Sequence, residues 1–253
     1  MNQKLTTSIA KKPIVLAITT MNDRAHQALA YFSQFADSEC HIYISHQITD
    51  QITRPLTVSM PYVWYSSMTE TWLSASRNHI LDQLDSGIFV ICDDDVQLVD
   101  GFVDHIRRAY ALYLDADATT FQTILPEWWL RKPYFATSKI HSRLSILSVS
   151  SIEITFDIAR VKSLWVRFDE QFGLWTLLPG GEENIFLSDV IWAWGKCIYV
   201  PFTLSAHPAE SSNTGKIDRS HKKHIFQRIF GTYIWTISVI VFRWYKYLTT
   251  LAG

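Results

Sequence analysis

The feature that most constrains this chain is a short apolar stretch that runs directly into three carboxylates. Residues 88–92 read Ile-Phe-Val-Ile-Cys, and Asp93, Asp94 and Asp95 follow without a break. Such a run is typical of an inner strand of a sheet covered on both faces. Adjacent carboxylates repel one another unless a bound cation neutralises them. Open α/β sheets also bind their ligands at the carboxyl ends of the strands, where these carboxylates lie. The stretch therefore predicts a metal-bound active-site edge. The alternative is a solvated turn that caps a helix starting near Asp100.

Strands and helices are predicted to alternate around this edge, from short apolar runs and from apolar residues at helical spacing. The strands are expected at residues 13–19, 41–45, 88–92, 119–125, 145–156 (one or two strands) and 197–207. The helices are expected at 23–35, 69–84, 100–114, 158–164 and 182–194. Residues 46–68 are expected to be irregular, because Pro55 and Pro61 interrupt any helix. This order predicts an α/β fold, with a mostly parallel central sheet and helices on both faces.

Composition excludes some classes of protein. The hydrophobic content of 48% supports a packed core, and the net charge of −1 carries no signature of nucleic-acid binding. The three cysteines form no Cys-x-x-Cys pair. Neither a disulfide framework nor a zinc site is therefore indicated, and we expect a reducing cytosol.

The charge is unevenly distributed along the chain. Residues 211–253 hold seven basic residues and one acidic residue. Apolar residues recur at helical spacing over 222–248, but the longest uncharged run there has 14 residues, and a spanning helix needs about 20. We therefore expect a catalytic domain at 1–212 and a basic amphipathic helical tail at 213–253. The tail would hold the protein peripherally on the anionic inner face of the cytoplasmic membrane. The alternative is a helix packed on the domain or on a second subunit.

Several short motifs follow one another along the chain in a recognisable order. They are Asn22-Asp23-Arg24, Ser74-Ala75-Ser76-Arg77-Asn78, Asp93-Asp94-Asp95-Val96, Phe168-Asp169-Glu170-Gln171-Phe172-Gly173 and Gly180-Gly181-Glu182-Glu183-Asn184. Over residues 13–207 they resemble the family-2 glycosyltransferases of the GT-A fold. That family has a Tyr-Asn-Arg turn, an Arg-Asn helix before an Asp-x-Asp strand end, a Phe-Asp-Glu-x-Phe stretch and a Gly-Glu-Asp stretch. The resemblance implies a Rossmann-like GT-A domain followed by the helical tail.

The resemblance assigns the acidic edge to a metal ion. Asp95 would bind the metal directly, and Asp93 would contact the ribose or reach the metal through water. Asp94 would lie on the nucleotide side with a less defined role. His207 is a candidate for completing the metal site, although a lone histidine is more often structural. Carboxylate and phosphate ligands fit Mn²⁺ or Mg²⁺, which would neutralise the leaving diphosphate.

The same resemblance predicts the nucleotide side of the site. Thr19 and Arg24 would lie near the nucleobase, and Arg77 would meet the diphosphate as a bidentate donor, with Asn78 beside it. Arg77 and Asn78 could also be an ordinary pair on a helix surface. The expected donor is a nucleotide-sugar, with a UDP-sugar first.

Glu182 and Glu183 are the candidates for the catalytic base that deprotonates the acceptor hydroxyl. Acids in the first turn of a helix are also common because they complement its dipole. The family has Asp at the position of Glu183, and this match favours Glu183 over Glu182. A single displacement assisted by such a base would invert the anomeric carbon.

Acceptor contacts are predicted on two segments. Trp128 and Trp129 lie in a long aromatic and basic loop, which gives them the strongest claim to contact a sugar. Asp169 and Glu170 would orient acceptor hydroxyls or simply cap a turn.

The sequence thus predicts a metal-dependent glycosyltransferase acting on a glycan or lipid-linked glycan acceptor. By analogy it belongs to the assembly of a bacterial surface glycan such as lipopolysaccharide or capsule. The alternatives are a metal-dependent phosphohydrolase or nucleotidyltransferase, and a non-catalytic, membrane-bound module that binds a glycan or a nucleotide.

Overall fold

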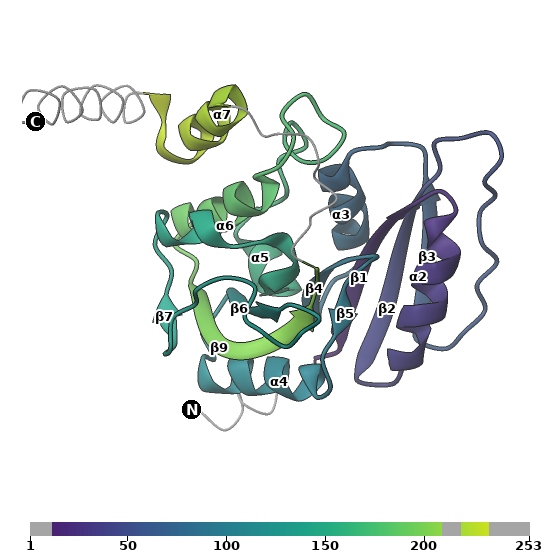
Figure 1. Ribbon diagram of the computed structural model, residues 1–253, viewed down its shortest axis with the longest axis horizontal. Helices are drawn as coiled ribbons and strands as arrows, with labels where there is room; N and C mark the ends of the chain where they lie inside the picture. Colours follow the sequence, from purple (N-terminus) through teal and green to yellow (C-terminus); the bar gives the residue numbers. More distant parts are fainter. Residues whose placement is uncertain (1–11, 209–218, 233–253) are drawn as a thin grey trace, which may run out of the picture.

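One mixed β-sheet runs through the part of the chain that the computed structural model describes, residues 12–208 and 219–232 (Figure 1). Its order is β3-β2-β1-β4-β8-β6-β9-β5, and β7 pairs with β9 beside this path. The strands are β1 (Ile14–Met21), β2 (Cys40–Gln47), β3 (Val63–Met68), β4 (Ile88–Asp93), β5 (Gln97–Leu98), β6 (Ala118–Ile124), β7 (Lys139–Ile140), β8 (Ile154–Asp157) and β9 (Cys197–Ala206).

Strand direction explains why distant parts of the sequence meet at one edge. β3, β2, β1 and β4 are parallel neighbours. β8 is antiparallel to both β4 and β6, and β9 is parallel to β6. Because the two reversals at β8 cancel, β6 and β9 run in the same direction as β4. The carboxyl end of β9, with His207 just beyond it, therefore reaches the same edge as Asp93 at the end of β4.

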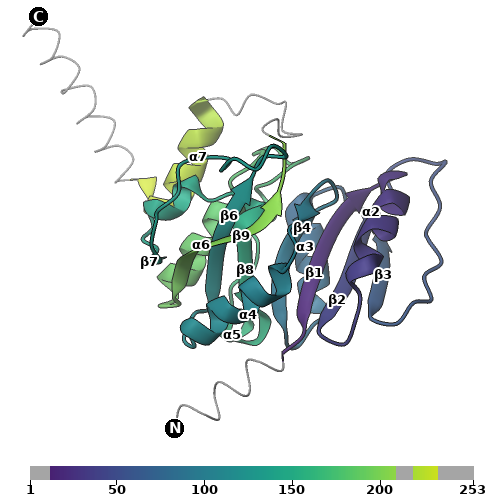
Figure 2. The same ribbon diagram turned by 60° about the horizontal axis from the view of Figure 1, so that its bottom comes forward.

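Helices cover both faces of the sheet, as the sequence predicts (Figures 1 and 2). They are α2 (Arg24–Phe32), α3 (Leu73–Asp82), α4 (Phe102–Leu112), α5 (Ile158–Ser163), α6 (Glu182–Trp192) and α7 (Arg219–Phe230). Side chains alternate along β1, so Leu16 packs in the cluster that holds α2 and α4, whereas Ala17 packs in the cluster that holds α3, α5 and α6. This two-sided burial accounts for the nearly continuous apolar runs of β1 and β4.

One prediction of local structure is wrong, and a second holds only in part. Residues 46–68 are not irregular throughout, because β3 occupies their end. β3 is an edge strand bonded only to β2, and it is partly exposed, so its apolar signal is weak. Most of residues 145–156 form 3₁₀ turns, and only the last part is strand. Serine hydroxyls bond to nearby backbone groups there, and Ser150 and Glu153 form a capping box, which competes with strand pairing.

α7 contains the described part of the basic tail, and it packs along α6. Ile225 and Ile229 form a small apolar cluster with Phe172 and Ile185. Ile225 also lies over Gly181, where an added Cβ would come within 2.6 Å of the isoleucine side chain. Gly181 has φ +81° just before the first turn of α6, so glycine suits both the backbone and the close approach of α7.

An ion-pair network fixes α7 at a second point. The Arg228 guanidinium donates to Asp169 at 2.8 Å and to Asp189 of α6 at 2.8 Å. Residues 209–218 and 233–253 lie outside the described part. The membrane association expected of the 213–253 tail therefore stays a prediction, and its described helix α7 packs on the domain. Among the described helices, none has both the length and the apolar character needed to cross a bilayer.

A buried histidine ties the segment after β7 to the sheet. His141 Nε2 pairs with Thr120 Oγ1 of β6 at 2.7 Å, and Nδ1 pairs with Ser145 Oγ at 3.0 Å. Burial lowers the pKa of His141 to about 4, and the nearby charges of Lys139 and Lys132 act in the same direction. The native fold therefore holds this imidazole neutral.

This neutrality predicts a loss of stability in acid. Above about pH 6.5 His141 is neutral in both states. As the pH falls to about 4, His141 binds a proton in the unfolded chain but stays largely neutral in the native state. Up to about 3 kcal/mol of unfolding free energy is therefore lost. His141→Gln, which keeps a hydrogen-bonding group but cannot titrate, should flatten this part of the pH profile in urea-unfolding experiments. At pH 7.5 His141 is neutral in both states, so the difference in unfolding free energy between the wild type and the variant gives the effect of the changed hydrogen bonds alone. An equally steep decline in the variant would contradict the prediction.

Candidate active site

A buried arginine lies at the centre of the candidate site. Arg77 on α3 is 0% exposed, and its Nη1 donates to Glu182 Oε1 at 2.9 Å. Its Nη2 donates to Asp93 Oδ1 at 3.2 Å, at the end of β4. A guanidinium cannot lose its charge, so its burial requires carboxylates at hydrogen-bond distance. Arg77 thereby joins the end of β4 to the first turn of α6.

The second glutamate of α6 has a different environment. Glu183 lines a pocket of about 240 Å³ together with Asp93, Arg131, Ser151 and His207. Burial raises the pKa of Glu183 well above its ordinary value, and the neighbouring Glu182 carboxylate adds to the shift. Both glutamates line the pocket, but the Glu182 carboxylate is engaged by Arg77, whereas Glu183 has a raised pKa. The two glutamates are therefore not equivalent.

An adjoining pocket collects most of the residues predicted to bind the nucleotide. Asp94 Oδ2 accepts from Thr20 Oγ1 at 2.6 Å, and Asp94 Oδ1 accepts from Arg24 at the start of α2. Burial raises the pKa of Asp94, which the Thr20 and Arg24 contacts partly offset. The pocket is lined by Thr19, Thr20, Met21, Arg24, Gln47, Leu73, Asp93, Asp94, Asp95, Leu174 and Trp175. It shares Asp93 with the Glu183 pocket, so the two form adjacent compartments.

Asp95 and His207 face each other across the edge of the sheet. Their Oδ1 and Nε2 atoms are 3.2 Å apart, and His207 Nδ1 pairs with the Pro208 carbonyl at 2.7 Å. The hydrogen bond to Asp95 raises the pKa of His207, and the same bond lowers the pKa of Asp95. The crossover at β8 brings these residues together although 112 positions separate them in the sequence.

The donor atoms here fit a divalent cation in part. No group of three or more metal-binding side chains occurs within residues 12–208 and 219–232. Asp93 is directed to Arg77 and, at 3.4 Å, to Ser151. A carboxylate and an imidazole are competent ligands for Mn²⁺ or Mg²⁺, and Asp95 with His207 supplies such a pair. Further ligands would have to come from the substrate and from water.

Some predicted site residues are used elsewhere. The Asn78 amide donates to the Phe168 carbonyl at 2.9 Å and to Glu170 at 2.8 Å, so it holds the 168–170 segment against α3. Asp169 accepts from Arg228 of α7. Trp128 and Trp129 are strongly exposed, and neither lines the two pockets.

Other residues that line the pockets lie outside the sequence motifs. Arg131 lies beside His207 because a bridge between Ile124 and Leu130 folds the loop back onto the sheet. Gln47 reaches the edge because β2 runs in register with β1 to its end. The motif positions carried no signal for these contacts, which depend on loop geometry and strand register.

No protein-family model matches this chain, and no curated protein matches its sequence. Its structure, however, matches solved structures of the S. aureus glycosyltransferase TarS. The match to TarS 1–349 has a TM-score of 0.58 and 12% sequence identity, and it covers 85% of this chain and 70% of that chain. The match to the complex of TarS 1–349 with UDP-GlcNAc has a TM-score of 0.57 and 12% identity, and it covers 87% of this chain and 73% of that chain. TarS has the GT-A fold.

This chain has the GT-A fold. The GT-A prediction made from the motifs is thus confirmed at the level of the fold. Against the longer TarS structure, the chain spans 42% of that protein, so the similarity concerns this domain and not the whole of TarS. In this GT-A domain the Asp93–Asp94–Asp95 run ends β4, and Glu182 and Glu183 open α6 across the edge.

Removal of Arg77 should be strongly destabilising. Arg77→Met leaves the Glu182 and Asp93 carboxylates without their partner, and breaking such a buried pair costs about 3–5 kcal/mol. The double variant Arg77→Met/Glu182→Gln should recover at least about 1 kcal/mol, because the buried charge is removed as well. Guanidinium-induced unfolding measures both effects.

Arg24→Met provides the matched control. Its guanidinium is half exposed, and Asp94 keeps its hydrogen bond from Thr20, so this change should cost clearly less than Arg77→Met. Equal losses for the Arg77 and Arg24 variants, or strict additivity in the Arg77–Glu182 pair, would contradict the central role of Arg77.

Proposed function

We propose that this protein is a glycosyltransferase that moves a sugar from a nucleotide-sugar, a UDP-sugar first, to a hydroxyl group of a glycan or lipid-linked glycan. One observation carries the proposal: two adjoining pockets of a GT-A fold share Asp93. One pocket is lined by Thr19, Arg24 and the Asp93–Asp95 carboxylates, which suit a nucleotide and its diphosphate. The other pocket is lined by Glu183. A donor lying across Asp93 would bring its sugar beside Glu183.

Charge neutralisation at the leaving diphosphate would come from a metal and from arginine. Asp95 and His207 would hold Mn²⁺ or Mg²⁺, which supplies Lewis-acid stabilisation of the diphosphate when bound. Arg24 and Arg131 line the two pockets and contribute fixed positive charge from the protein itself.

We assign the role of base to Glu183 and a positioning role to Glu182. Glu182 is engaged by Arg77, and it keeps the first turn of α6 at the end of β4. The raised pKa of Glu183 makes its carboxylate a stronger base than an ordinary glutamate. It would take the proton of the acceptor hydroxyl as that oxygen attacks the anomeric carbon. A single displacement of this kind inverts the anomeric configuration.

The setting of the reaction is part of the proposal. Residues 213–253 would hold the enzyme on the anionic inner face of the cytoplasmic membrane, where lipid-linked acceptors are found. The product would belong to a surface glycan of the lipopolysaccharide or capsule type.

A donor screen tests the reaction class. With a panel of nucleotide-sugars and Mn²⁺ or Mg²⁺, we expect one donor to undergo slow hydrolysis that releases a nucleoside diphosphate. Asp95→Ala should reduce the rate at least about 100-fold, and excess chelator should stop it. Activity that persists in chelator would refute the metal assignment. Release of phosphate or pyrophosphate would instead identify a phosphohydrolase or nucleotidyltransferase.

Two glutamine substitutions separate the roles of the adjacent glutamates. Glu183→Gln should lower the transfer rate by about 10²- to 10⁴-fold with little change in donor affinity, because only the proton acceptor is lost. Glu182→Gln should chiefly lower stability, because it weakens the pair with Arg77. In the wild type, kcat/KM should rise with pH as the base ionises, at a higher pH than for an ordinary carboxyl group. A fully active Glu183→Gln enzyme would be incompatible with this assignment.

A further inference from the structure

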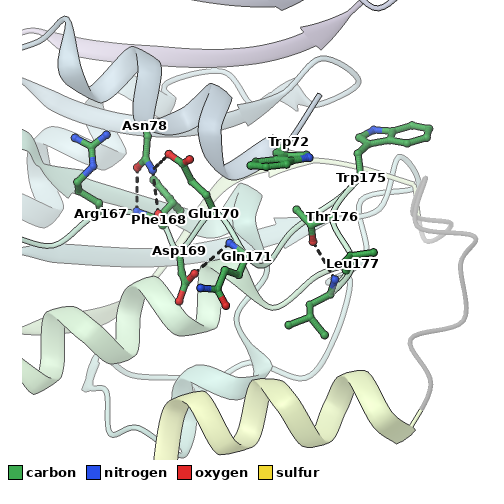
Figure 3. Close-up of a pocket in the computed structure, with 11 residues that line it drawn as sticks. Trp72, Asn78, Arg167, Phe168, Asp169, Glu170, Gln171, Trp175, Thr176 and Leu177 are labelled. Carbon is green, nitrogen blue, oxygen red and sulfur yellow. Dashed lines mark hydrogen bonds between the residues drawn. The ribbon is translucent and has the colours of Figure 1, made fainter. Parts of the chain in front are cut away.

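A large cavity beside the candidate donor pocket has no role in the reaction proposed above. It measures about 1060 Å³, at the upper end of the range that small-molecule sites occupy. It lies between the start of α3 and the segment from Arg167 to Leu178 (Figure 3). Trp175 lines both this cavity and the donor pocket, so the two are neighbours.

Most polar side chains around the cavity are already bonded to the protein. The Asn78 amide is engaged by Phe168 and Glu170. Arg167 forms a two-point ion pair with Asp82, with Nη2 to Oδ2 at 2.9 Å. These bonds leave little free hydrogen-bonding capacity at the end of the cavity where Asn78 and Arg167 lie.

The remaining polar groups show the same pattern. Asp169 accepts from the Gln171 backbone N–H at 3.1 Å and from Arg228 at 2.8 Å. Thr176 Oγ1 donates to the Gly173 carbonyl at 2.9 Å and accepts from the Leu178 N–H at 3.1 Å. A sugar ring needs several free donors and acceptors. Among the described lining residues, the side-chain groups without a protein partner include the Gln171 amide, one Glu170 oxygen and the indole N–H groups of Trp72 and Trp175. Apolar atoms make up most of the lining surface, so the cavity suits an apolar ligand better than a glycan.

The other end of the cavity is apolar and exposed. Trp72, Trp175 and Leu177 lie there (Figure 3). These residues are 45%, 67% and 94% exposed. Trp175 also adopts φ 68°, in the left-handed region that a bulky residue rarely enters. Trp128, Trp165 and Trp194 also have a positive φ, so the backbone conformation alone does not mark the cavity. Exposed apolar side chains gathered beside a cavity are expected where a ligand covers the surface.

The cavity leads on to a second hollow. The two share Arg167 and Asp169, and the second is also lined by Leu164, Trp165 and Trp192, near the ends of α5 and α6. A chain longer than the cavity would pass Arg167 and Asp169, whose charges are paired with Asp82 and Arg228, and continue along the exposed Trp165 and Trp192. Its near end would reach Trp175 at the donor pocket.

We propose that this cavity binds the hydrocarbon chain of a lipid-linked acceptor, an assignment that rests on the proposed glycosyltransferase function. The chain lies against Trp72, Trp175 and Leu177, where burial of apolar surface provides the affinity. The polar head of the acceptor then lies on the Trp175 side, next to the donor pocket. The cavity thereby selects acceptors by their lipid part.

Binding of two simple probes to the full chain tests the site. Octyl β-glucoside, kept below its micelle-forming concentration, should bind saturably in isothermal titration. Methyl β-glucoside, with the same sugar and no chain, should bind at least about tenfold more weakly, because it buries almost no apolar surface. Equal affinities would overturn the proposal and identify a sugar site instead.

Matched double variants locate the binding. Trp72→Ala/Leu177→Ser should weaken octyl glucoside binding about tenfold or more. Trp64→Ala/Leu112→Ser is the control, since Trp64 is 44% exposed like Trp72, Leu112 is exposed as well, and neither lines the cavity. Equal effects from both pairs, or no effect from the Trp72/Leu177 pair, would overturn the assignment. Unchanged donor hydrolysis by the Trp72/Leu177 variant verifies that it is folded.

The two proposals fail in different ways. If octyl glucoside binds in the cavity while no nucleotide-sugar is cleaved, the glycosyltransferase function fails and the acceptor assignment fails with it, whereas the hydrocarbon site remains. If a nucleotide-sugar is cleaved while octyl glucoside does not bind, the function stands and this inference is overturned.

Discussion

The buried guanidinium of Arg77 is the interaction on which the rest of the site depends. It bonds to Asp93 at the end of β4 and to Glu182 at the start of α6, and so it fixes the distance between two elements that are remote in sequence. Without a cation between them, two carboxylates in this interior would repel each other. With it, the first turn of α6 is held against the acidic edge of the sheet. The position of Glu183 beside Asp93 follows from that contact.

The sheet supplies the second condition for the site. β8 runs against its neighbours on both sides, and this single strand lets β9 end at the same edge as β1 and β4. His207 reaches Asp95 because of strand direction, not because of any local motif. The same strand therefore joins the parallel half of the sheet, with its acidic edge, to the half that ends in the histidine.

Much of this arrangement could be predicted from the sequence, for identifiable reasons. The apolar runs of β1 and β4 are strong signals because those strands are buried on both faces. The acidic run at the end of β4 is equally clear. β3 gives no clear signal, because an edge strand buries too little to show a pattern. The serine-rich 3₁₀ turns before β8 are hard to distinguish from strand in the sequence, because side-chain bonds to the backbone compete with pairing there. The pocket positions of Arg131 and Trp175 depend on how two loops fold back, which no local pattern encodes. Asn78 shows the converse case, because its motif position predicted a nucleotide contact while its amide is bonded to the Phe168 segment.

The docking of α7 has a mechanical consequence. Ile225 covers Gly181, immediately before the turn that carries Glu182 and Glu183, and Arg228 bonds to Asp189 further along α6. These contacts couple the two helices mechanically at two points. A force that acts on α7 is therefore transmitted to α6, the helix that bears the candidate base. The orientation of α7 relative to that base is set by side-chain contacts between the two helices.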